Sequence, residues 1–136
     1  MLNKILKLSA FIATISLLSF QGSSIAQLSG LKSIPGDYAT IETAIAALNS
    51  QGVGTGGVTF NVSAGHTETF STPTAGLISA NGTLTDQIIF QKSGVGNNPL
   101  ITAALNGTGT TDGIIIITGG DYITFDGIDV FLTLAL

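Results

Sequence analysis

Three stretches of the chain share one pattern: Val58-Thr59-Phe60-Asn61-Val62, Ile88-Ile89-Phe90-Gln91 and Ile123-Thr124-Phe125-Asp126-Gly127-Ile128-Asp129-Val130. Each has a Phe at its middle, beside Thr, Ile or polar residues. The Phe residues lie 30 and then 35 residues apart, within the period of about 20–50 residues that is typical of solenoids. Because one solenoid repeat cannot close its own core, it must stack on neighbouring repeats. The pattern therefore predicts an architecture, and it specifies no activity.

The composition also favours β-structure. Of the 136 residues only 9% are charged, against about 25% in a typical soluble domain. The 18 glycines, together with many Thr, Ser and Asn residues, stand in place of the missing charges. Thr, Val, Ile and Phe fit strands, whereas Gly and Asn tolerate the backbone of tight turns. Disorder is the rival interpretation of such a chain, and the recurring apolar runs argue against it.

The chain has no cysteine. This excludes disulfides, thiol catalysis, Cys-ligated zinc and a lipid-modified N-terminal cysteine. For an exported chain, stability must then come from backbone ladders and packing, without covalent cross-links.

The N-terminus has the pattern of an export signal. Lys4 and Lys7 give it a positive start, and residues 8–20 form an apolar run broken only by Ser and Thr. The small residues of Ser24-Ile25-Ala26 follow, so residues 1–26 are predicted to be a signal peptide that is cleaved after Ala26. A membrane anchor is the alternative, but the run is shorter than the roughly 20 residues needed to span a bilayer. The sequence thus predicts a secreted or cell-surface protein.

Cleavage would make the chain more acidic. Loss of Lys4 and Lys7 changes the formal net charge from −4 to −6, with Lys32 and Lys92 left against eight carboxylates. Nucleic acids are bound by Lys and Arg clusters, so such a surface predicts no nucleic-acid partner. It also disfavours anionic membrane surfaces. No membrane insertion is expected after signal cleavage.

A lead-in and one helix are expected before the strands. Residues 27–39 form the lead-in, with Gly30, Pro35 and Gly36 as breakers. Residues 40–52 are predicted to be a helix, with Thr40 as N-cap and Gly52 as C-terminal stop. Its apolar residues recur at i, i+3, i+4 and i+7 and form one stripe: Ile41, Ala44, Ile45 and Leu48. A helix this short needs an apolar surface beneath it, so we expect it to cap the first coil of a solenoid.

Residues 58–136 are predicted to form the first coils of the solenoid. The glycine-rich residues 52–57 are expected to be a flexible turn, and residues 67–70 and 77–78 are weaker strand candidates. Residues 88–91 are expected to begin the second coil, and residues 100–103 to continue it. The four-isoleucine run in residues 114–118 is typical of a strand that is buried on both faces. Gly127 is interpreted as a bulge within one strand that covers residues 122–130.

The C-terminal residues 131–136 are apolar and uncharged. A terminal solenoid repeat should carry a polar outer face. We therefore expect an incomplete solenoid, truncated after about three coils, whose open end is prone to end-to-end self-association. The alternative is that these residues form a closing element.

The chain resembles the start of a pectin-lyase-like right-handed parallel β-helix. The resemblance covers roughly residues 36–130 and is carried by YATIETAIAALN (38–49), VTFNVSAG (58–65) and GIIIITGGDYITFDGI (113–128). These stretches of sequence are most similar to the N-terminal part of large secreted cell-surface proteins of Bacteroidota. Many of those proteins use type IX secretion. The resemblance implies an all-β parallel β-helix with an N-terminal capping helix. In the lyases, later coils hold the calcium-binding aspartates and the basic catalytic residue, and no position here matches them.

Asp121, Asp126 and Asp129 are the candidate metal ligands. Their oxygens suit Ca²⁺, but Ca²⁺ takes about six to eight oxygens and this spacing matches no calcium loop. Solvated positions on turns and strand faces explain them better. The sequence therefore predicts neither a metal site nor another cofactor.

Other candidate residues give no complete site. His66, two residues before Glu68, forms a possible acid–base pair without a nucleophile, and a turn position explains it better. The glycine runs 52–57 and 107–113 lack the Lys of a phosphate loop. Three aromatic residues are possible sugar platforms but are more often packing residues: Tyr38, Phe70 and Tyr122. No catalytic or cofactor-binding residue is predicted.

Two functions fit these features. One is a non-catalytic structural module that displays a face for carbohydrate or partner contact. The other is the remnant of a polysaccharide lyase or glycoside hydrolase on the same fold. The first is favoured because the chain has no Arg, and a lyase needs a base and groups that neutralise a uronate carboxylate. No lyase activity is therefore expected.

Overall fold

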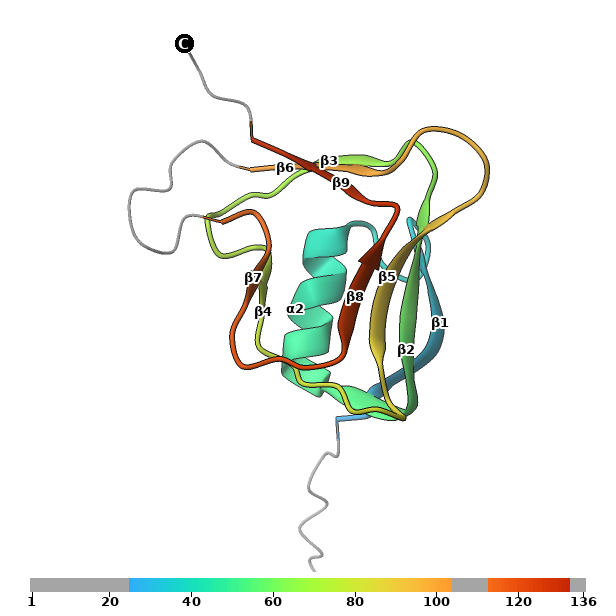
Figure 1. Ribbon diagram of the computed structural model, residues 1–136, viewed down its shortest axis with the longest axis vertical. Coiled ribbons are helices and arrows are strands. Elements are labelled where there is room, and N and C mark those ends of the chain that lie inside the picture. The colour runs from blue at the N-terminus through green and yellow to red at the C-terminus, as the bar shows by residue number, and fades with distance from the viewer. Residues whose placement is uncertain (1–24, 104–112, 133–136) are drawn as a thin grey trace, which may run out of the picture.

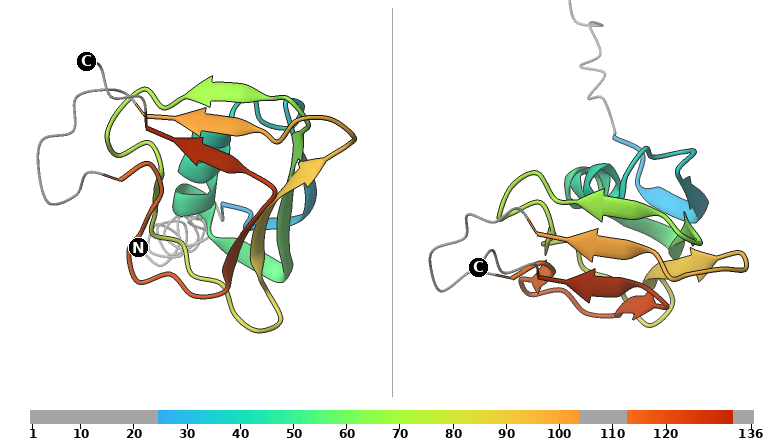
Figure 2. Two further views of the ribbon diagram at one scale, coloured as in Figure 1. Left: turned by 45° about the horizontal axis from the view of Figure 1, so that its top comes forward. Right: turned by 90° about the horizontal axis from the view of Figure 1, so that it is seen from above.

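Every strand pair in the structure is parallel. The computed structural model describes residues 25–103 and 113–132. Its nine strands form three sheets, and its one helix lies at one end of the stack of strands (Figure 1 and Figure 2). The elements are β1 (Leu28–Ile34), α2 (Ile41–Gln51), β2 (Val53–Ser63), β3 (Thr67–Thr69), β4 (Leu77–Ile78), β5 (Ile88–Ser93), β6 (Leu100–Thr102), β7 (Ile116–Ile117), β8 (Ile123–Asp126) and β9 (Asp129–Phe131).

The three sheets define successive coils. Their strand orders are β1-β2-β5-β8, β3-β6-β9 and β4-β7. The chain thus visits each sheet in turn and returns to the first, so that β2, β5 and β8 lie side by side. Figure 2 shows β3, β6 and β9 in three successive layers. This confirms the expected parallel β-helix architecture of stacked coils.

The repeated Phe residues form a column inside the stack. Phe60 is in register with Phe90, and Phe90 with Phe125. The ring centroids lie 4.5 Å and 4.9 Å apart, with interplanar angles of 15° and 4°. Such offset or stacked pairs add to the free energy gained by burying the rings. The prediction that the three stretches repeat one β-element is confirmed for their Phe-centred parts, which in the third stretch is residues 123–126.

The helix covers the N-terminal end of the stack. Thr40 caps it, because its hydroxyl accepts from the Thr43 N–H while the Thr43 hydroxyl accepts from the Thr40 N–H. Gly52 ends it and donates its N–H to the Leu48 carbonyl at 2.8 Å. The predicted apolar stripe is fully buried: Ile41, Ala44, Ile45 and Leu48. In Figure 2, α2 and β1 lie at the β3 end of the layers.

The segment expected to be a lead-in contains a strand. β1 pairs with β2, and Ile34 of β1 is fully buried opposite Val62. Gly30 does not break the strand, because its positive φ of 70° lies where the register shifts between Leu28 and Gly30. β1 therefore extends the first sheet to the level of the helix.

The glycine-rich run before Val58 is part of β2 and not a flexible turn. It faces the irregular part of β1, where Leu28 pairs with Val53 and Gly30 with Val58. Gly57 has a φ of 74°, and a Cβ there would lie 2.5 Å from the Gln87 carbonyl oxygen. Glycine is needed at this position for its backbone conformation and for close approach of the next coil.

Two further expectations about the last described coil are wrong. Gly127 is not a bulge, because β8 and β9 belong to different sheets and Gly127, with φ of 64°, lies at the corner between them. The isoleucine run is not buried on both faces, since only Ile116–Ile117 is a strand and Ile117 is 46% exposed. β7 pairs with β4, and the described residues supply no later strand beside it.

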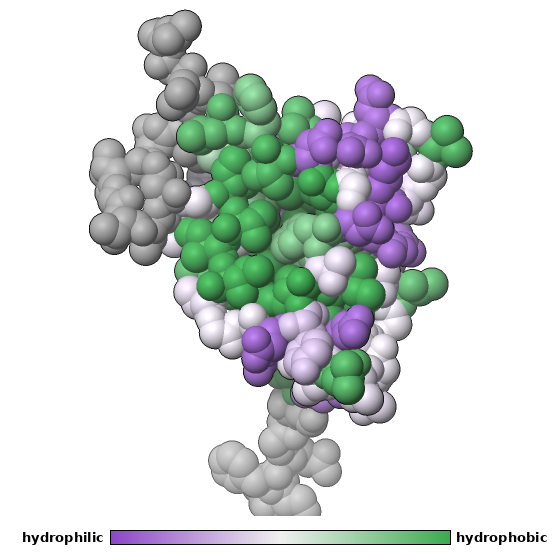
Figure 3. Space-filling view, viewed as in Figure 1, coloured by the Kyte–Doolittle hydropathy of each residue, from purple (hydrophilic) through white to green (hydrophobic). Residues whose placement is uncertain are grey.

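The end of the stack opposite the helix is apolar. Figure 3 looks onto the end formed by β7, β8 and β9, and it shows a broad apolar surface there. Half-buried side chains contribute to this end, among them Ile114, Ile115, Ile123, Phe125 and Ile128. The predicted signal peptide apart from Ile25 and Ala26, most of the second glycine run and residues 133–136 lie outside the described residues.

Candidate functional site

The three candidate metal ligands lie at separate places. Asp126 ends β8, where it is in register with Gln91, whereas Asp129 begins β9 in the neighbouring sheet. Asp121 lies in the turn before β8, where its backbone N–H donates to Asn81 Oδ1 at 2.8 Å. Within residues 25–103 and 113–132, no group of three His, Asp or Glu side chains is placed to hold a metal ion.

His66 and Glu68 do form a pair, and the pair serves the helix. His66 Nε2 lies 3.1 Å from Glu68 Oε2, and the Glu68 side chain is only 4% exposed. The two Glu68 oxygens accept the backbone N–H groups of Ile41 and Glu42, each at 2.7 Å. A carboxylate at a helix N-terminus satisfies amides that lack a partner within the helix and interacts favourably with the helix dipole. Glu68 is therefore the main link between β3 and α2.

Two other side chains join the helix to the first coil. Glu42 accepts hydrogen bonds from the backbone N–H of Ser71 at 3.0 Å and from the Ser71 hydroxyl. Asn49, near the other end of α2, donates to the Leu77 carbonyl at 2.7 Å and accepts from the Ser79 N–H at 2.9 Å. Sequence reasoning missed both links, although Glu42 and Asn49 are seven residues apart and thus share one edge of the helix.

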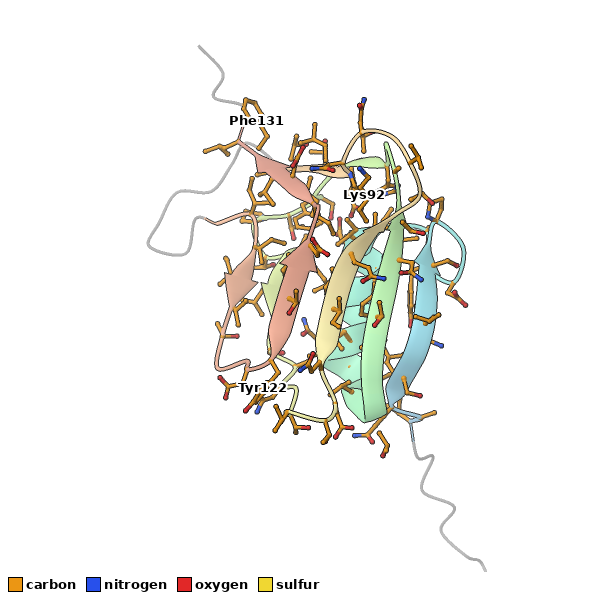
Figure 4. All side chains as sticks on the ribbon, turned by 45° about the vertical axis from the view of Figure 1, so that its right-hand side comes forward. Lys92, Tyr122 and Phe131 are labelled. Atoms are coloured by element: carbon orange, nitrogen blue, oxygen red, sulfur yellow. The ribbon has the colours of Figure 1, made fainter. Side chains whose placement is uncertain are left out.

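Two of the three candidate sugar-stacking aromatics are packing residues. Tyr38 makes an edge-on contact with Phe60 at a centroid distance of 5.8 Å, and Phe70 is buried. Partial burial, with a contribution from the Asp37 charge, raises the pKa of the Tyr38 hydroxyl above its ordinary value. Tyr122, which is labelled in Figure 4, is 49% exposed and has a positive φ of 55°. Its side chain lies beside the start of β8, apart from the other two.

A groove follows the outer face of the β3–β6–β9 sheet. One part has a volume of about 550 Å³, and an adjoining part has about 270 Å³. The two parts share Thr67 and Leu100, so we treat them as one surface, called the sheet-face groove. Its other lining residues are Gly65, Glu68, Thr69, Gly96, Asn97, Asn98, Thr102 and Asp129. Most of the lining residues have polar side chains, and Leu100 is the large apolar residue among them.

A chain of hydrogen bonds fixes one wall of this groove. Lys92 Nζ donates to the Gly96 carbonyl at 2.6 Å and to Asn98 Oδ1 at 3.1 Å. Asn98 Nδ2 in turn donates to Asp129 Oδ1 at 3.0 Å. On the floor, the hydroxyls of Thr69 and Thr102 lie 2.7 Å apart. The loop between β5 and β6 is thus held against the start of β9, and Figure 4 shows Lys92 at this loop.

The comparisons with known proteins found no match among family models, curated proteins or solved structures. Within the described residues, no helix has the length and apolar character needed to cross a membrane. The fold assignment therefore depends on the strand register itself. Any assignment of function depends on the side chains and their contacts.

Proposed function

We propose that this chain is a non-catalytic module of a secreted cell-surface protein, with a pectin-lyase-like parallel β-helix as its fold. In this module the helix covers one end of the stacked coils. The outer faces of the sheets are available for contact with carbohydrate or a partner. The resemblance of residues 36–130 to such proteins of Bacteroidota and the signal-like residues 1–26 support this assignment.

The observation that supports this proposal most is that Glu68 binds the N-terminus of α2. The pair His66–Glu68 is the best acid–base candidate in the sequence, yet both Glu68 oxygens are taken up by the first amides of α2. A general acid or base needs access to a substrate proton. A side chain that is 4% exposed and already bonded to two backbone amides suits a structural role. His66 and Glu68 are residue types that could do acid–base catalysis, but here Glu68 holds the helical cap. The pair therefore supports a non-catalytic module.

An activity assay tests this assignment. The purified protein is incubated with polygalacturonate, with and without Ca²⁺, and with neutral polysaccharides, while ultraviolet absorbance and new reducing ends are followed. We expect no turnover, because the described residues bring together no base, nucleophile and charge-neutralising group. Turnover that disappears in His66→Asn, with the fold unchanged by circular dichroism, would contradict the proposal and favour the lyase or hydrolase alternative.

Export is tested separately. Mass spectrometry of the protein released by its producing cells should find Gln27, or its cyclised form, at the N-terminus. An intact Met1 on the released protein would contradict the predicted cleavage after Ala26.

A further inference from the structure

We infer that the sheet-face groove binds a neutral oligosaccharide, with Asp129 and Asn98 holding sugar hydroxyls and Phe131 supplying an apolar platform. This inference rests on the proposed function of a surface-binding module and names the face and the class of ligand.

Strand register places the groups on one face. In the β3–β6–β9 sheet, Thr67, Leu100 and Asp129 are in register, and so are Thr69, Thr102 and Phe131. Successive side chains of a strand point to opposite sides of the sheet. Ile101 is fully buried between the two rows, so both rows point outward. The outer face therefore carries hydroxyls, a carboxylate and one aromatic ring.

The pair Asn98–Asp129 suits the recognition of adjacent hydroxyls. An Asn amide has two N–H donors, and a carboxylate has two acceptor oxygens. The bond between them uses one N–H and involves Oδ1 of Asp129. Among the described residues, no other hydrogen bond involves this amide nitrogen or the second carboxylate oxygen, so the pair keeps one donor and one acceptor for a ligand. One sugar hydroxyl can accept from the amide while its neighbour donates to the carboxylate.

Phe131 supplies the apolar contact that such a site needs. It is 59% exposed, and Figure 4 shows its ring directed away from the coil. It lies two positions after Asp129 along β9, about 6.6 Å away, and at the edge of the groove, where it is in register with Thr102. Small-molecule sites combine apolar and aromatic surface with a few oriented polar groups. The C–H face of a sugar ring can lie on Phe131 while its hydroxyls reach the Asn98–Asp129 pair.

Charge selects a neutral sugar over a uronate. The described residues include seven carboxylates and only two lysines. Lys92 is the cation beside the groove, and its ammonium already donates to Gly96 and Asn98. A uronate would bring a further negative charge next to Asp129, which is unfavourable at short range.

Nuclear magnetic resonance of the ¹⁵N-labelled protein provides the test. The probes are cellohexaose, xylohexaose, mannohexaose and hexagalacturonate. At least one neutral hexaose should shift the amides of Asn98, Thr102 and Asp129, with an affinity at least tenfold higher than that of hexagalacturonate. Equal or tighter binding of hexagalacturonate, shifts confined to the β1–β2–β5–β8 sheet, or no binding of any hexaose would overturn the inference.

Matched variants locate the site. Asp129→Ala and Phe131→Ala should each weaken binding of the neutral hexaose by about tenfold or more, which corresponds to about 1.4 kcal/mol. Asp126→Ala removes the same charge from the neighbouring sheet, and Tyr122→Asn removes an exposed aromatic at a positive-φ position that Asn tolerates. Both controls should bind within about twofold of the parent. Controls that lose as much as the site variants would contradict the assignment.

A further variant keeps the test valid if Asp129→Ala fails to fold. Thr67→Val retains the β-branched shape and removes one groove hydroxyl, so it should weaken binding without altering the dispersed amide spectrum. Unchanged binding by Thr67→Val, with Phe131→Ala also unchanged, would overturn the inference. Absence of binding defeats only the inference, whereas turnover of a polysaccharide would defeat the proposed function.

Discussion

The first and the last described coils carry the same strand pattern but differ in burial. Phe60 and Phe90 are fully buried, whereas Phe125, which occupies the same column, is only partly buried. Phe90 has a ring stacked on each side, at 4.5 Å and 4.9 Å. Burial of a repeated residue is therefore determined by the neighbouring coils and not by its own repeat.

The two ends also differ in how they are covered. At the N-terminal end, α2 buries its apolar stripe and is joined to the first coil by Glu68, Glu42 and Asn49. At the other end, the described residues leave a broad apolar surface (Figure 3). The end of the stack that α2 covers is therefore closed, whereas the described residues leave the other end open.

The largest effect should come from the Phe column. We expect Phe90→Ala to lower the free energy of unfolding by about 3–5 kcal/mol, because it removes a fully buried ring and leaves a cavity. Phe125→Ala should cost roughly half as much, since part of that ring is already exposed. Urea unfolding followed by circular dichroism measures both. Equal costs for the two variants would contradict the difference in burial between the coils.

Loss of the Glu68 link should have the next largest effect. Glu68→Ala leaves two helix amides without their acceptor, which should cost about 2–4 kcal/mol. Glu68→Gln keeps one carbonyl oxygen and should cost less. Asp126→Asn, on an exposed strand position, serves as the control and should change stability by about 0.5 kcal/mol or less. A Glu68→Ala variant as stable as this control would show that the cap is held by apolar packing alone.

The smallest effect should be the pH dependence contributed by Asp86. The Gly56 N–H donates to its carboxylate at 2.7 Å and, with the Thr83 hydroxyl, lowers its pKa below the ordinary value of 3.8. Because the folded pKa is the lower one, the stabilisation is present above pH 3.8 and is lost as the pH falls through the folded pKa. Urea midpoints between pH 6 and 2.5 should fall less steeply in Asp86→Asn than in the parent. A steeper fall in the variant would contradict the assigned bonds.

The sequence predicted the features that depend on local periodicity. The apolar stripe from Ile41 to Leu48 was sufficient to locate the helix and its caps, and the spacing of Phe60, Phe90 and Phe125 was sufficient to predict stacking. β1 was missed because Gly30 and Pro35 are common strand breakers, and because its partner, β2, lies beyond the helix. Pairing across that distance leaves no periodic signal within either segment.

The candidate groove was not predicted for the same reason. Asn98 and Asp129 are 31 residues apart and meet only because β6 and β9 are adjacent. The recurrence of Phe60, Phe90 and Phe125 predicts the pairing within one sheet, but loops of unequal length separate that sheet from the next. Turn residues such as Gly127 were misread since a positive φ occurs at bulges and at sheet corners alike.

Site-resolved amide hydrogen exchange can verify that the chain is a stack of parallel coils capped by α2. In a capped stack of parallel coils, the amides of β2 and β5 lie between two neighbouring strands, whereas those of β8 lie beside one described strand. We predict the slowest exchange in residues 58–62 and 88–92, with residues 123–126 exchanging at least tenfold faster. Glu68→Ala should accelerate exchange in β3 more than in β5. Equal protection of β8 and β5, or rapid exchange throughout β2, would contradict it.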